Sequence, residues 1–164
     1  MNVPSAHALQ AAVKRLSPHL IVTALLLCGC AANTALVGSS GVPMGTVKVA
    51  STTFGNVTLA PTACVSGEHR LFLGADFLDG SRGTVLRLIL EPTGETKFRV
   101  FDAASPLDPG IVFERAACSK ALVSLERTGW QIDDIHDVRI SLDLDCRTAS
   151  GDSLQGTLSV AHCH

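Results

Sequence analysis

The chain after residue 45 alternates between apolar and polar residues with a period of two, the pattern of strands that bury one face. Turn residues interrupt this pattern at short intervals. The segments expected to be strands are 46–51, 56–62, 70–77, 84–91, 97–102, 111–116, 121–127, 138–146 and 154–163. Eight or nine short strands predict an all-β fold, a small antiparallel sandwich or barrel.

A helix competes with a strand only around residues 114–125, where the apolar spacing fits both, and we favour the strand. The last two strands give the clearest hairpin, because apolar residues fall on alternate positions between Val138 and Leu144. With the turn centred near residues 150–151, Cys146 is expected opposite about Gln155, and Cys163 opposite about Val138.

The N-terminal stretch has the charged, apolar, small order of a secretory signal. Lys14 and Arg15 precede the apolar run 20–27, and small residues follow around Gly29. A start at Val13 would give this leader a more typical beginning than Met1. The run is shorter than the roughly 20 residues of a spanning helix, so it predicts export.

The segment 27–30, Leu-Cys-Gly-Cys, resembles the lipobox of bacterial lipoproteins, with a small residue at −1 and the invariant cysteine at +1. In that family the cysteine corresponding to Cys30 receives a diacylglyceryl group before cleavage, and its freed amine usually takes a third chain. The resemblance departs at Cys28, where alanine, serine or threonine is commoner. Modification of Cys28, or plain cleavage near residues 31–32, are the alternatives.

Two or three acyl chains on one residue would hold the protein at a membrane. Ala31 follows the lipidated cysteine where aspartate often marks inner-membrane retention in the family. The resemblance therefore implies an outer-membrane destination in a cell that has one. We expect a signal peptide at 1–29, a lipidated N-terminus and flexible tether at 30–45, and a β domain at 46–164.

Cleavage before Cys30 would leave 135 of the 164 residues, enough for one domain. The 11 basic residues that remain face 15 acidic ones, which argues against nucleic acid as a partner. Tyrosine is absent and tryptophan occurs once, which counts against the aromatic platforms of saccharide-binding and single-strand-binding surfaces.

Four cysteines remain in the mature domain, and an exported chain meets an oxidising compartment, so two disulfides are expected. The hairpin separates Cys146 from Cys163 by about 26 Å, which excludes that bond. Cys64–Cys163 with Cys118–Cys146, or Cys64–Cys146 with Cys118–Cys163, are the pairings left. We favour the first, because a terminal strand beside an early one commonly closes a sandwich.

Two stretches resemble the LpqH-type lipoprotein antigens of mycobacteria. One runs from Asn56 through Cys64 to Gly74, and the other is the closing segment 156–163. In that family the cysteines at the places of Cys64 and Cys163 are expected to pair. Cys118 and Cys146 have no counterpart there. The resemblance implies a small β domain on a lipid anchor and supplies no catalytic residues.

Several side chains suggest metal or ligand chemistry. His162 and His164 flank Cys163, with His69 and His136 elsewhere, but a strand points the thiol away from both imidazoles. We therefore favour a disulfide cysteine beside solvent-facing histidines over a zinc or copper site. The acidic residues Asp133, Asp134 and Asp137, together with Asp143 and Asp145, lack the spacing of a calcium loop and indicate a solvated acidic loop that enters a strand with a polar outer face. Trp130 is expected in the core rather than as an exposed platform.

No catalytic motif appears, so we predict no catalytic residues, no metal and no cofactor. The leading interpretation is a lipid-anchored lipoprotein of the cell envelope that acts as a structural or binding module. Its partners would be the membrane and an unidentified envelope or extracellular molecule. The alternatives are a small envelope hydrolase and a lipid or ligand carrier with an apolar interior.

Overall fold

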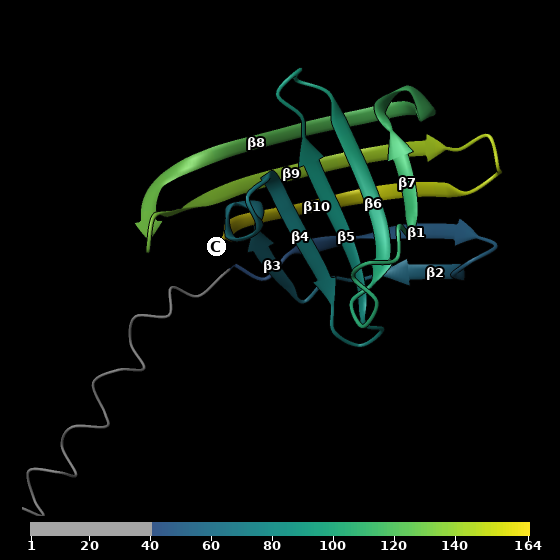
Figure 1. The fold of residues 1–164 in the computed structure, drawn as a ribbon, viewed down its shortest axis with the longest axis horizontal. Helices are drawn as coiled ribbons and strands as arrows, with labels where there is room; N and C mark the ends of the chain where they lie inside the picture. The colour runs from purple at the N-terminus through teal and green to yellow at the C-terminus, as the bar shows by residue number, and fades with distance from the viewer. Residues whose placement is uncertain (1–40) are drawn as a thin grey trace, which may run out of the picture. The chain divides into compact units, whose positions relative to one another are not determined.

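The structure is a computed structural model that describes residues 41–164, and these residues form two antiparallel sheets of five strands (Figure 1). Sheet A has the order β2-β1-β10-β9-β8, and sheet B has the order β3-β4-β5-β6-β7. Sheet A contains β1 (Met44–Ser51), β2 (Gly55–Leu59), β8 (Cys118–Ile132), β9 (Ile135–Arg147) and β10 (Ser153–Cys163). Sheet B contains β3 (Ala63–Ser66), β4 (Leu73–Asp79), β5 (Thr84–Leu90), β6 (Thr96–Asp102) and β7 (Ile111–Glu114). Two short 3₁₀ helices, η1 (Gly67–Arg70) and η2 (Arg115–Ala117), complete the fold.

The two sheets pack face to face, and the strands of sheet B run steeply across those of sheet A (Figure 1). Their inner faces supply one core of buried apolar side chains, including Phe77, Leu88 and Phe98 from sheet B and Ile140 and Leu158 from sheet A. The predicted all-β fold is confirmed, and of the two predicted architectures the sandwich is the one observed.

Most predicted strands are present, but the bounds of several are shifted. The predicted strand 56–62 is divided into β2 and β3, which belong to different sheets. Arg70, predicted in a strand, ends η1 instead, and β4 begins only at Leu73. The predicted tether ends earlier than residue 45, because β1 begins at Met44. Gly41 already contacts the domain, since its N–H donates to the carbonyl of His162 at 2.6 Å. Residues 115–117 form one 3₁₀ turn, so the predicted strand 111–116 ends at Glu114. The predicted strand 121–127 is confirmed and extends over Cys118–Ile132.

The disulfides follow the favoured pairing. Cys64 on β3 bonds Cys163 on β10, with 5.2 Å between their Cα atoms, and this bond joins sheet B to sheet A. Cys118 bonds Cys146 between the neighbouring strands β8 and β9, with Cα atoms 3.8 Å apart. The hairpin register agrees with the prediction at Cys163, which faces Val138, and differs by one residue at Cys146, which faces Leu154.

The β8–β9 hairpin corrects the prediction for Trp130. Asp133 and Asp134 form its two-residue turn with φ angles of 48° and 64°, left-handed values that aspartate tolerates better than most residues. The β8–β9 register is irregular between Arg127 and Gln131, close to this turn. Trp130 therefore lies near the hairpin tip rather than over the core, and it is 73% exposed.

The predicted signal peptide, the lipidation site Cys30 and most of the tether lie outside the described residues. Within residues 41–164 no helix has the length and hydrophobicity to cross a membrane.

Candidate functional site

Two neighbouring rows of side chains cross the outer face of sheet B. In the first row Asp76 on β4 lies opposite Arg87 on β5, and Arg87 lies opposite Arg99 on β6. Alternation along a strand places these residues on the face away from the core. In the second row the residues are apolar: Leu78, Val85 and Phe101. The outer face therefore carries a charged row directly beside an apolar row.

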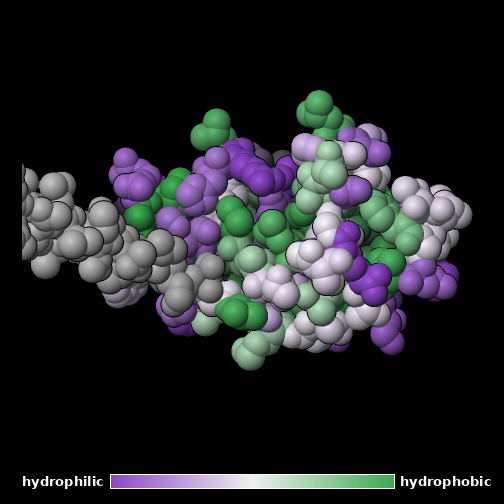
Figure 2. Space-filling view, turned by 90° about the horizontal axis from the view of Figure 1, so that it is seen from below, coloured by the Kyte–Doolittle hydropathy of each residue, from purple (hydrophilic) through white to green (hydrophobic). Residues whose placement is uncertain are grey.

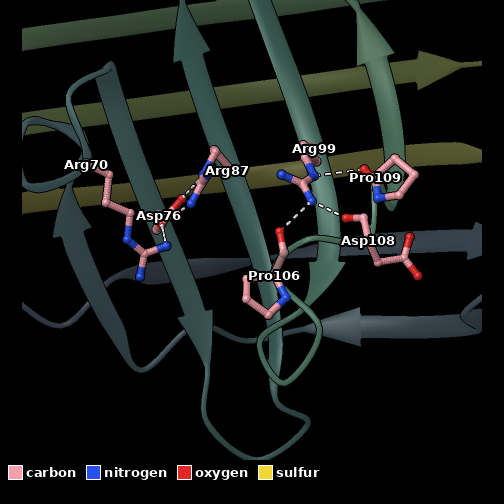
Figure 3. Close-up of polar contacts among 7 residues, drawn as sticks. All are labelled: Arg70, Asp76, Arg87, Arg99, Pro106, Asp108 and Pro109. Carbon is pink, nitrogen blue, oxygen red and sulfur yellow. Dashed lines mark hydrogen bonds and ion pairs between the residues drawn. The ribbon is translucent and has the colours of Figure 1, made fainter.

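Asp76 is the centre of an ion cluster (Figure 3). Its carboxylate accepts hydrogen bonds from Nε and Nη2 of Arg87 at 2.6 and 2.9 Å, and from Nη1 of Arg70 at 2.7 Å. Asp76 is only 1% exposed although it points away from the core. Because two guanidinium groups meet one carboxylate, the cluster carries one surplus positive charge.

Aromatic rings hold Arg87 in place. Its guanidinium carbon lies 4.8 Å from the ring centre of Phe72 and 5.0 Å from that of Phe101, within cation–π distance of both. The side chain of Arg87 is 16% exposed, whereas that of Arg70 is 48% exposed. Arg87 is thus a fixed donor, and Arg70 is the part of the cluster that solvent reaches.

Arg99 organises the loop 103–110 beside the cluster (Figure 3). Its Nε donates to the carbonyl of Pro109 at 2.8 Å, and its Nη2 donates to the carbonyls of Pro106, at 3.0 Å, and Asp108. The guanidinium carbon lies 4.3 Å from the ring centre of Phe101. Phe101 belongs to the outer face but is only 1% exposed, because Arg99 and the loop cover its ring.

The ion cluster of Arg70, Asp76 and Arg87, the apolar row and the loop enclose a cleft of about 410 Å³. This volume lies within the range of about 300–1,000 Å³ that small-molecule sites have. The cleft is lined by Arg70, Asp76, Leu78, Val85, Arg87, Phe101, Ala103 and Pro106. Guanidinium donors on one side and apolar surface on the other give it the means to hold an anionic group and a hydrocarbon part together.

Asp79, at the end of β4, fixes the strand that carries Asp76. Its carboxylate accepts from the Ser81 hydroxyl at 2.6 Å and from the N–H groups of Ser81 and Ala60 at 3.1 and 3.0 Å. Burial by itself would raise the pKa of the Asp79 carboxyl, but these hydrogen bonds hold the pKa below its ordinary value.

A second polar group lies where η1 meets the tip of the β8–β9 hairpin. Glu68 accepts from the backbone N–H of His136 at 2.8 Å and from Arg127 at 2.6 Å, and it lies 3.0 Å from Nδ1 of His136. Burial opposes the ionised carboxylate, yet the hydrogen bonds from His136 and the charge of Arg127 leave the pKa of Glu68 below its ordinary value. The hollow beside these residues is lined by no serine, threonine or cysteine.

The remaining histidines that the sequence suggested lie near this end too. Nδ1 of His162 is 2.9 Å from the Asp137 carboxylate, and the rings of His69 and His164 are 5.3 Å apart, edge to face. Cys163 is committed to its disulfide. Among residues 41–164 no group of three or more histidine, cysteine or acidic side chains is arranged to hold a metal ion.

The acidic residues whose oxygens could bind calcium are dispersed. Asp133 and Asp134 form the hairpin turn, and Asp143 pairs with Lys120 at 2.5 Å. The prediction of a solvated loop is wrong for Asp137, which lies within β9 and is buried. Its carboxylate accepts from the Thr128 hydroxyl at 2.8 Å and lies 2.9 Å from Nδ1 of His162.

The sequence reasoning did not identify the residues of the cleft. One signal for them exists: Asp76 interrupts the apolar segment 71–78, and an acid inside a buried strand needs a charged partner. The identity of that partner depends on the pairing of β4 with β5, which brings together residues eleven positions apart.

Comparison of the chain with family models, with curated proteins and with solved structures gave no match. The resemblances to the lipobox and to LpqH-type antigens therefore stay predictions from the residues alone.

Proposed function

We propose that the protein is a lipid-anchored lipoprotein of a bacterial cell envelope, and that its sandwich is a binding module. The observation that carries the binding role is the cleft on sheet B, where a buried carboxylate holds two arginines beside apolar surface. A cleft with a few convergent polar groups is the usual form of a small-molecule site.

The anchor is supported by the order of the leader and by the residues 27–30. Cys30 lies eleven residues before Gly41, the residue at which the described structure begins. Eleven extended residues reach at most about 40 Å, so an acylated Cys30 would hold Gly41 within that distance of the membrane surface.

The anchor is tested by comparing Cys30→Ala with the matched variant Cys28→Ala in the bacterium that makes the protein. We expect the wild type and Cys28→Ala to enter the detergent phase on phase separation, and Cys30→Ala to stay in the aqueous phase. Loss of the detergent-phase protein in Cys28→Ala alone, or its retention in Cys30→Ala, contradicts acylation of Cys30.

The binding role is tested on a soluble form that begins at Ala31 and so keeps the whole sandwich and both disulfides. A mixed set of small anionic, neutral and cationic compounds is screened by amide chemical shifts. We expect the shifts to concentrate on Asp76, Arg87 and Phe101. A screen with no binder, or with binders only elsewhere, contradicts a binding function of this cleft.

Figure 2 shows the face seen from below, on which hydrophobic residues lie interspersed with hydrophilic ones.

A further inference from the structure

We infer that the cleft of sheet B binds a monoanionic amphiphile, a carboxylate that carries a short hydrocarbon chain. The inference rests on the proposed function of this cleft as a binding site, and it names the chemical class of the ligand.

The donors of the cluster exceed its acceptors. A guanidinium group has five N–H donors, and the Asp76 carboxylate takes one from Arg70 and two from Arg87. Arg70 is half exposed and lines the cleft, so its remaining donors are available to a second anion. A carboxylate fits this fork with two parallel hydrogen bonds.

The charge of the cluster selects a monoanion. Arg70 and Arg87 together exceed Asp76 by one positive charge, and no other charged side chain lines the cleft. One carboxylate neutralises this surplus. A phosphate monoester carries about −1.5 to −2 at pH 7 and would leave negative charge uncompensated beside apolar walls.

The position of the apolar row accounts for the hydrocarbon chain. Residues two positions apart on a strand are separated by about 7 Å, so Leu78 and Val85 lie one such step from Asp76 and Arg87. Val85 and Phe101 are themselves buried, so the apolar surface that the cleft presents comes from Leu78, Ala103 and Pro106. A chain of several carbons attached to the bound carboxylate would extend over these three residues. Each methylene that it buries there is worth at most about fourfold in affinity.

The experiment titrates the soluble form from Ala31 with hexanoate, octanoate and decanoate at pH 7 by calorimetry, below their micellar concentrations. Octanol, octylammonium and octyl phosphate are titrated in parallel. We expect saturable one-to-one binding of the carboxylates, with a twofold to fourfold gain per added methylene. Octanol, octylammonium and octyl phosphate should each bind at least tenfold more weakly than octanoate.

The matched variants are Arg70→Gln, in the cleft, and Arg139→Gln, an exposed arginine on sheet A. Arg70→Gln should weaken octanoate binding at least tenfold, and Arg139→Gln should leave it unchanged. Equal urea unfolding midpoints of the two variants show that the loss reflects the site rather than the fold.

Four outcomes overturn the inference. Octyl phosphate as the tightest ligand refutes the choice of a monoanion, and octanol binding as tightly as octanoate refutes the role of the arginines. If compounds from the mixed screen bind in the cleft while no carboxylate does, the ligand class is wrong and the proposed binding function stands. If nothing binds in the cleft at all, the proposed function fails as well.

Discussion

The two disulfides differ in what they join, and this difference predicts unequal contributions to stability. Cys64–Cys163 closes a loop with a sequence separation of 99 residues and connects one sheet to the other. Cys118–Cys146 closes a separation of only 28 residues between two strands that already pair. The perturbation is to replace each pair by two alanines in turn.

The chain-entropy description of cross-links gives the magnitude. Closing a loop of about 100 residues raises the free energy of the unfolded chain by about 4.7 kcal/mol. Closing a loop of about 29 residues raises it by about 3.6 kcal/mol. The variant that lacks Cys64 and Cys163 should therefore be about 1 kcal/mol less stable than the variant that lacks Cys118 and Cys146. Each loss is a large fraction of the free energy of unfolding of an ordinary domain, which is about 5–15 kcal/mol.

The assay is equilibrium unfolding in urea of the soluble form from Ala31, followed by far-ultraviolet circular dichroism. With a slope near 2 kcal/mol per molar urea, the two midpoints should differ by about 0.5 M. An equal or lower midpoint for the variant that lacks Cys118 and Cys146 would refute the reasoning, because it would mean that loop length and the inter-sheet link do not govern the effect.

Three further predictions concern the site and its support. Asp76→Ala leaves two arginines without their buried partner and should lower the free energy of unfolding by about 3 kcal/mol, measured in urea. Because the pKa of Asp79 is lowered in the folded state, the ionised carboxylate stabilises the fold above about pH 4, and this stabilisation is lost as the pH falls further. Asp79→Asn should therefore flatten the fall in stability between pH 5 and pH 2, roughly. Gly110→Ala should lower the thermal midpoint, because Gly110 has φ +62° and a Cβ there would lie 2.2 Å from the Val100 carbonyl oxygen.

Strands whose two faces differ in polarity were predictable from local sequence. The predicted strand 138–146 lies within Ile135–Arg147, and the predicted strand 154–163 corresponds to Ser153–Cys163. The break between β2 and β3 was missed although its cause is local. Pro61 has no N–H to donate, so the chain leaves sheet A at Leu59 and enters sheet B at Ala63.

The register of a single hairpin excluded a Cys146–Cys163 bond, because that register follows from the turn position. The arginine cleft was not accessible in this way. The pairing of β4 with β5 brings Arg87 beside Asp76, and the position of η1 brings Arg70 to the same carboxylate. The periodicity of a single strand predicts neither of these arrangements. Trp130 was misplaced for a similar reason, since composition does not reveal how far a hairpin extends beyond the core.

The central claim is a binding module held at a membrane by an acylated Cys30. Intact-mass analysis of the wild-type protein purified from a membrane fraction tests it most directly. The account predicts a chain that begins at Cys30, carries the mass of two or three acyl chains and has no free thiol among Cys64, Cys118, Cys146 and Cys163. An unacylated chain, whether it retains its leader or is cleaved elsewhere, would contradict the account.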